Sequence, residues 1–117
     1  MAMGDTEIVS VNTEAHDGAV LVSPRGDVDM SRSPVLRQTL HDVQARSPGR
    51  MIVDLEHVDY MDSSGLATLV EAMRSAKKTD TKMVLCGMNE KVRAIFEIAR
   101  LHHFFTIVDS VDEAVSA

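Results

Sequence analysis

Two short apolar runs without alternation constrain the fold of this chain most strongly. They are Met51-Ile52-Val53 and Met83-Val84-Leu85-Cys86, the latter within a strand predicted from Lys82 to Cys86. A strand that is apolar at successive positions is buried on both faces, which is typical of a parallel sheet covered by helices. A helical stripe separates the two runs and consists of Leu66, Leu69, Val70 and Met73. This order of strand, helix and strand predicts a mostly parallel sheet.

The segments before these runs continue the alternation of strands and helices. Two strand-like runs, Ile8 to Glu14 and Ala19 to Ser23, flank Asp17-Gly18, a dipeptide that is typical of a hairpin turn. Ser33-Pro34 then predicts a helix up to about residue 46, with the serine as its N-cap and the proline at its first position.

The last third of the chain adds two more helices and one strand. Asn89 is expected to cap the third helix, a strand from Phe105 to Val108 follows, and a short helix covers Ser110 to Val115. The order β-β-α-β-α-β-α-β-α predicts one α/β domain over residues 1–117, with residues 1–6 poorly ordered. Its sheet should be mostly parallel, with an antiparallel edge hairpin at the N-terminal end and helices packed against it.

Composition and charge exclude several classes of function. Residues 1–62 carry 11 acidic side chains against 5 basic ones and the chain has no Trp, so nucleic-acid binding is not expected. The single cysteine, Cys86, lies in an apolar run and is expected to be a buried, inert thiol. No apolar run approaches about 20 residues and the first residues lack a signal-peptide pattern, so we expect a cytoplasmic protein without a membrane span.

The block Met61-Asp62-Ser63-Ser64-Gly65 marks the candidate site. It ends a predicted loop over residues 54–62, which leaves the carboxyl end of a buried strand, where sites of such sheets lie. A helix starts directly after it, and the free N–H groups of that helix start favour anions. Either Asp62 or Ser63 could cap this helix. Gly65 costs helix stability, about 1 kcal/mol relative to alanine, which favours close approach of a partner to the backbone there.

Three kinds of site are conceivable here: a nucleophilic serine, a metal site and a serine that accepts phosphate. A nucleophile needs a base, and His57, His102 and His103 are available, but the chain has no Gly-x-Ser-x-Gly elbow. The adjacent His102-His103 should point apart on a helix and close it, so no metal ligand is predicted. No phosphate-binding glycine motif is present, so no catalytic residue and no cofactor are predicted either. A phosphate acceptor needs no machinery in the chain itself, and either Ser63 or Ser64 could serve.

Several motifs resemble the signature of the STAS domain. They are Val53-Asp54-Leu55, then Val58, and then Met61 to Leu66. More narrowly, they resemble the bacterial anti-sigma factor antagonists of the sporulation and general-stress type. Gly26 to Asp29 is similar to the Gly-x-hydrophobic-Asp pattern of this family, and weaker similarity continues through the last third of the chain.

The resemblance implies a partner switch rather than an enzyme. The unphosphorylated antagonist would bind an anti-sigma factor that is also a serine kinase, and the sigma factor would be released. The kinase would phosphorylate the first serine of the block, here Ser63, and a PP2C-type phosphatase would restore it. We expect Gly65→Val to impair partner binding more than folding. The residues expected to contact the kinase are Asp27, Asp29, Asp62, Ser63, Ser64, Gly65 and Leu66.

The same resemblance leaves one alternative. A freestanding STAS module could regulate a partner other than a sigma factor, such as a transporter, a lipid-trafficking complex or a stressosome. The intact Asp-Ser-Ser-Gly block at residues 62–65 favours the phosphorylatable antagonist.

Overall fold

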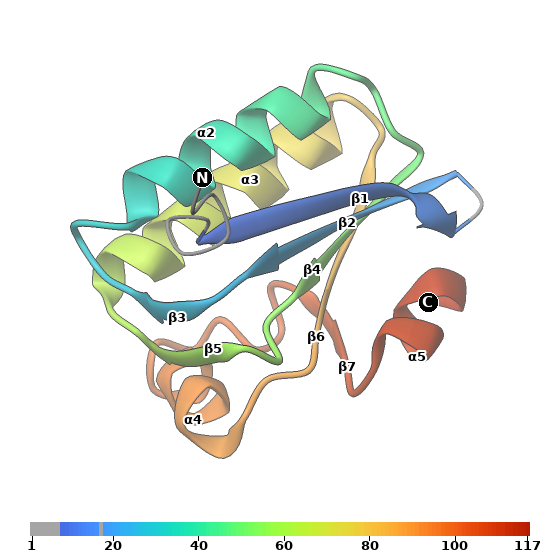
Figure 1. Ribbon diagram of the computed structural model, residues 1–117. Coiled ribbons are helices and arrows are strands. Elements are labelled where there is room, and N and C mark those ends of the chain that lie inside the picture. Colours follow the sequence, from blue (N-terminus) through green and yellow to red (C-terminus); the bar gives the residue numbers. More distant parts are fainter. Residues whose placement is uncertain (1–7, 17) are drawn as a thin grey trace.

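A mostly parallel sheet of five strands forms the centre of the computed structural model, which describes residues 8–16 and 18–117 (Figure 1). The strand order is β1-β2-β4-β6-β7. β1 is antiparallel to β2, and the other neighbours are parallel. The predicted fold class is therefore confirmed. The strands are β1 (Val9–His16), β2 (Ala19–Pro24), β4 (Arg50–Asp54), β6 (Lys82–Cys86) and β7 (Thr106–Val108).

Helices cover both faces of this sheet. α2 and α3 lie side by side on one face and α5 lies against the other (Figure 1). Successive residues of β4 therefore face different layers: Met51 and Val53 belong to the core under α2 and α3, and Ile52 to the core under α5. This two-sided burial explains the apolar runs without alternation. The helices are α2 (Ser33–Gln44), α3 (Ser63–Lys78), α4 (Glu90–Ile98) and α5 (Val111–Ser116).

A second, two-stranded sheet lies beside the main one and was missed by the sequence analysis. β3 (Gly26–Val28) is parallel to β5 (Val58–Met61), and Val28 lies opposite Met61. The loop predicted over residues 54–62 is therefore wrong, because its second half is a strand. Only the first and last residues of β5 are buried, so the strand shows neither alternation nor a continuous apolar run.

The N-cap residues of α3 and α4 agree with the prediction from the sequence, and that of α2 differs from it. Asp62 caps α3, which decides between the two residues left open, and Asn89 caps α4 as predicted. The N-cap of α2 is Arg32, whose side chain makes no capping bond, so the prediction of Ser33 is wrong. The carboxylate of Asp29 already accepts the backbone N–H of Arg32 at 3.2 Å, which fixes the turn before the helix.

Cys86 and the histidine pair show one success and one failure of prediction. Cys86 is fully buried in β6, and this burial raises the pKa of its thiol to about 12, with the charge of Asp54 adding to the effect. His102 and His103 do not point apart, since their ring centroids are 4.1 Å from each other. The reason is that α4 ends at Ile98, so the pair lies in the turn that follows the helix.

Some expectations fall on residues that the structure leaves undescribed. The poorly ordered segment over residues 1–6 and the first residue of the Asp17-Gly18 turn lie outside the described residues. The antiparallel pairing of β1 and β2, which that turn was expected to join, is present. Over residues 8–16 and 18–117, no helix is long and apolar enough to cross a membrane.

Candidate functional site

Asp62 organises the start of α3 through its carboxylate. Its Oδ1 accepts the backbone N–H groups of Ser64 at 2.9 Å and Gly65 at 3.2 Å, and also the hydroxyl of Ser64. The hydroxyl of Ser64 contributes most to holding the pKa of Asp62 below its ordinary value of 3.8, and the N–H groups of Gly65, Ser64 and Met30 act in the same direction. Asp62 is therefore an ionised cap at neutral pH.

The two serines of the block have different surroundings. Ser64 is half-buried, and its hydroxyl donates to the Asp62 carboxylate. Ser63 is exposed, and its hydroxyl forms no hydrogen bond with any residue that the structure describes. The Ser63 hydroxyl is thus free to react with a group from outside, whereas modification of Ser64 would break the bond between its hydroxyl and the Asp62 carboxylate.

Gly65 is buried beneath β3, which explains why it has no side chain. A Cβ atom there would lie 2.9 Å from the carbonyl oxygen of Val28 and 2.5 Å from Cγ of Met61. The idea that Gly65 admits a partner is therefore wrong, because the backbone of β3 already fills this space. Leu66 is only 9% exposed and belongs to the core. Both residues shape the site from below, so Gly65→Val should harm folding first.

Asp27 and Asp29 lie next to the start of α3, as expected, but through the second sheet rather than the main one. β3 and β5 are paired in parallel, and the N–H of Asp62 donates to the carbonyl of Val28 at 3.2 Å. The hydroxyl of Ser31 contributes most to lowering the pKa of Asp29. We call Asp27, Asp29 and Asp62 the acidic edge. None of the three forms an ion pair with another described residue.

A groove of about 610 Å³ runs along α3 from Ser63. Val70 and Leu101 line its apolar part, and Arg74 and Lys78 lie toward its other end. The carboxylate of Glu71 also lines the groove, between Ser63 and these two cations. The groove was not predicted from the sequence. The spacing of residues 63, 67, 70, 74 and 78 places them on one helix face and could have indicated it.

The comparison with family models decides the identity of the fold. The STAS domain model matches residues 10–114, which is nearly the whole chain. The chain belongs to the STAS-domain family. The resemblance drawn from the Asp-Ser-Ser-Gly block and its flanking motifs is therefore confirmed.

Relatives of this STAS domain are anti-sigma factor antagonists. The anti-sigma-B factor antagonist of Listeria monocytogenes is 30% identical over 82 residues, which are 70% of this chain and 72% of that protein. The Staphylococcus aureus protein of the same name is 27% identical over 93 residues, which are 80% and 86% of the two chains. The crystal structure of an anti-sigma factor antagonist from Mycobacterium paratuberculosis matches with a TM-score of 0.82 and 27% identity, covering 92% of each chain.

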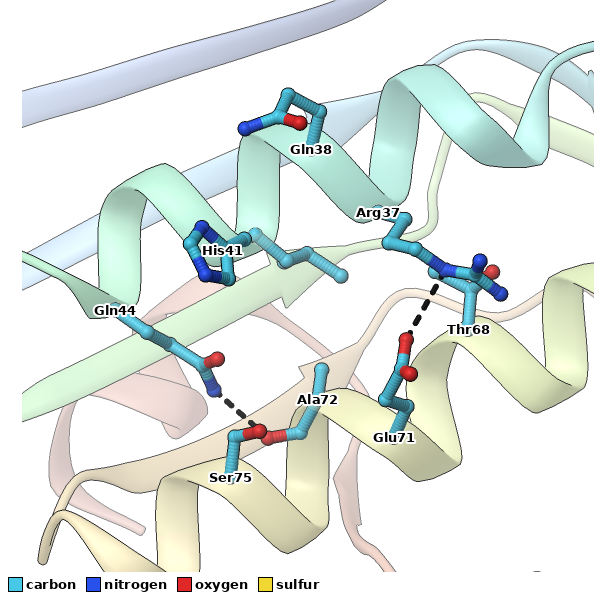
Figure 2. A pocket seen from close by; sticks show the side chains of 9 residues that line it. Arg37, Gln38, His41, Gln44, Thr68, Glu71, Ala72 and Ser75 are labelled. Carbon is cyan, nitrogen blue, oxygen red and sulfur yellow. Dashed lines mark hydrogen bonds and ion pairs between the residues drawn. The ribbon is translucent and has the colours of Figure 1, made fainter.

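A separate hollow of about 310 Å³ lies between α2 and α3 of the STAS domain (Figure 2). Nε of Arg37 is 3.0 Å from a carboxylate oxygen of Glu71, and Gln44 donates to the backbone carbonyl of Ala72 at 2.7 Å. The ion pair and the hydrogen bond connect the two helices at different positions along α2 (Figure 2). We interpret this hollow as the packing seam that holds α3 in place against α2.

The remaining chemistry of the STAS domain is limited. The part of the chain that the structure describes holds no group of three or more metal-ligating side chains. No base is hydrogen-bonded to Ser63 within the described ranges, which a nucleophilic serine would need. The arrangement offers an exposed hydroxyl on a rigid helix start beside a row of carboxylates, which suits a site that is modified and recognised by other proteins.

Proposed function

We propose that this STAS domain is an anti-sigma factor antagonist controlled by phosphorylation of Ser63. Unphosphorylated, it binds an anti-sigma factor that is also a serine kinase, and a sigma factor is set free. The kinase transfers the terminal phosphoryl group of ATP to the Ser63 hydroxyl, the complex dissociates, and a PP2C-type phosphatase hydrolyses the phosphoserine. The chain is then a substrate and a binding partner in the cytoplasm, with no catalysis of its own.

The observation that carries this proposal is the difference between the two hydroxyls. The hydroxyl of Ser64 is engaged by Asp62, and that of Ser63 is exposed and free of bonds to described residues. A kinase must place the accepting hydroxyl in line with the phosphoryl group, which an exposed serine on a fixed backbone allows. The anti-sigma factor antagonists of Listeria monocytogenes and Staphylococcus aureus, as relatives, support the same function.

The acidic edge explains how the modification acts as a switch. A phosphate adds about -1.5 to -2 charges, and the N-terminus of a helix stabilises an anion by roughly 0.3–1 kcal/mol, so folding should change little. Binding should change much more, because a dianion beside Asp27, Asp29 and Asp62 would be desolvated among like charges. A penalty on the order of 3 kcal/mol corresponds to about 100-fold weaker binding.

The experiment is to incubate wild type, Ser63→Ala and Ser64→Ala with the kinase and ATP and to measure intact mass. Wild type and Ser64→Ala should each gain one phosphate, about 80 Da, and Ser63→Ala should gain none. Ser64→Ala also loses a bond to the α3 cap, so its folding is checked first by circular dichroism. The proposed switch is refuted if Ser63→Ala gains a phosphate or if wild type gains none.

A further inference from the structure

Two loops at the acidic edge repeat one arrangement. The paired strands β3 and β5 are each followed by an Asp-x-Ser sequence, Asp29-Met30-Ser31 in the first loop and Asp62-Ser63-Ser64 in the second. In both loops Oδ1 of the aspartate accepts the N–H and the hydroxyl of the serine two positions later. The middle residue, whose side chain takes no part in these bonds, is Met30 in one loop and Ser63 in the other.

Met30 is the more exposed of two large hydrophobic side chains near the acidic edge, with 77% of its area exposed against 48% for Tyr60, which is paired with Asp27. A single exposed apolar side chain is common, so the exposure of Met30 does not by itself indicate a binding site. The backbone around it is the distinguishing feature. The carboxylate of Asp29 holds the N–H groups of Ser31 at 3.0 Å and Arg32 at 3.2 Å, and the N–H of Met30 contributes to the low pKa of Asp62. A loop with such a fixed backbone loses less backbone conformational entropy when it binds a partner.

The charges around Met30 indicate what kind of surface it meets. Asp27, Asp29 and Asp62 surround the two loops, and no described residue forms an ion pair with them. Among the described residues, the one cation that acts on the pKa of Asp29 is the exposed Arg32, so acidic side chains outnumber basic ones around Met30. A partner that buries Met30 must therefore bring cations to the rim of its pocket. A symmetric contact with a second copy would instead place two acidic edges against each other, which like-charge repulsion disfavours.

We propose that Met30 is the apolar anchor of the docking surface and enters an apolar pocket, rimmed by basic side chains, on the kinase partner. The proposal rests on the proposed function, because it concerns the surface around Ser63. Methionine is unbranched and adapts to irregular pockets, and buried anchors of this kind carry much of the energy of an interface. Val28 and Met61 are paired and the N–H of Met30 acts on the carboxylate of Asp62, so the two loops are neighbours. A partner seated on Met30 should therefore also cover Ser63.

The test is calorimetric binding of the kinase to wild type, Met30→Ala, Met30→Leu and Ile98→Ala, with the melting temperature of each variant measured alongside. Ile98 is a matched control, since it is 83% exposed at the end of α4 and lies outside both loops. Met30→Ala should bind about 30-fold more weakly. Met30→Leu keeps the apolar volume and should bind within about 3-fold of wild type, as should Ile98→Ala. All melting temperatures should agree, since neither side chain is buried.

The outcomes separate this proposal from the proposed function. If wild type binds the kinase and Met30→Ala binds equally well, the anchor is wrong and the phosphorylation switch stands. If wild type does not bind the kinase, both proposals fail. If sedimentation shows wild type to be a dimer and Met30→Ala a monomer, the occupant is a second copy and the proposal is overturned. Loss of binding in both Met30→Ala and Met30→Leu would also contradict it, because an apolar anchor should survive the change to leucine.

Discussion

The loops that follow β3 and β5 form the same aspartate-centred hydrogen bonds, yet they continue into different structures. After Asp62 the chain enters α3 at once, whereas after Asp29 it turns first and α2 starts only at Ser33. The third residue after each aspartate shows the contrast: Gly65 is buried under β3 and Arg32 is exposed. Hydrogen bonds to an aspartate thus fix the conformation of the turn. Whether the turn is buried or exposed depends on which other elements pack against it, as β3 does against Gly65.

The largest effect should come from adding one methyl group to the buried loop. Gly65→Ala forces Cβ against the Val28 carbonyl and Met61, so we expect it to lower the free energy of unfolding by about 2 kcal/mol. Alanine at the corresponding position of the other loop, Arg32→Ala, should lower the free energy of unfolding by less than about 0.5 kcal/mol. Urea denaturation of both variants measures the difference. Equal costs would show that packing does not distinguish the loops.

A smaller effect is expected when each aspartate is removed. Asp62→Ala deletes the cap of α3 and should cost about 1 kcal/mol, and Asp29→Ala should cost less because its loop is more exposed. The pKa of folded Asp62 lies below 3.8, so its contribution is present above that pH and is lost as the pH falls further. We therefore expect the difference in free energy of unfolding between wild type and Asp62→Ala to be smaller at about pH 3 than at pH 7, as measured by urea denaturation. A difference that grows in acid contradicts this role of Asp62.

The smallest effect should be kinetic and should come from the strand before the first loop. Asp27→Lys reverses one charge of the acidic edge and should slow association with the kinase about 5-fold at low salt, with little change at high salt. Asp42→Lys, on α2, changes the net charge equally and is the control. Stopped-flow or surface-plasmon measurements at two salt concentrations give both rates. Equal slowing by the two variants would mean that net charge, and not the acidic edge, steers the partner.

The main sheet could be predicted because its signal is local. The runs Met51 to Val53 and Met83 to Cys86 are buried on both faces, and consecutive apolar residues in the sequence indicate this burial directly. The small sheet of β3 and β5 could not be predicted in the same way. Its strands hold three and four residues, and exposed Asp27 and Tyr60 interrupt any apolar pattern.

The candidate site also combines features that could be predicted from local sequence with features that depend on residues distant in the sequence. A helix cap at Asp62 or Ser63 follows from residue type and position, and the structure assigns it to Asp62. The family resemblance pointed to Ser63 as the phosphate acceptor. The role of Gly65 could not be predicted, since the atoms that fill the space around it come partly from Val28, on a strand distant in the sequence. The free hydroxyl of Ser63 and the bonded one of Ser64 are also a matter of side-chain direction, which adjacent serines in a sequence do not reveal.

The most direct test of the switch is the affinity of the kinase for the two forms of the protein. Fully phosphorylated and unphosphorylated wild type are purified, and binding to the kinase is measured by calorimetry, with the melting temperature of each form as the control. The phosphorylated form should bind about 100-fold more weakly, and the two forms should have nearly equal melting temperatures. Equal affinity of the two forms, or weaker binding explained by unfolding of the phosphorylated one, would contradict the proposed switch.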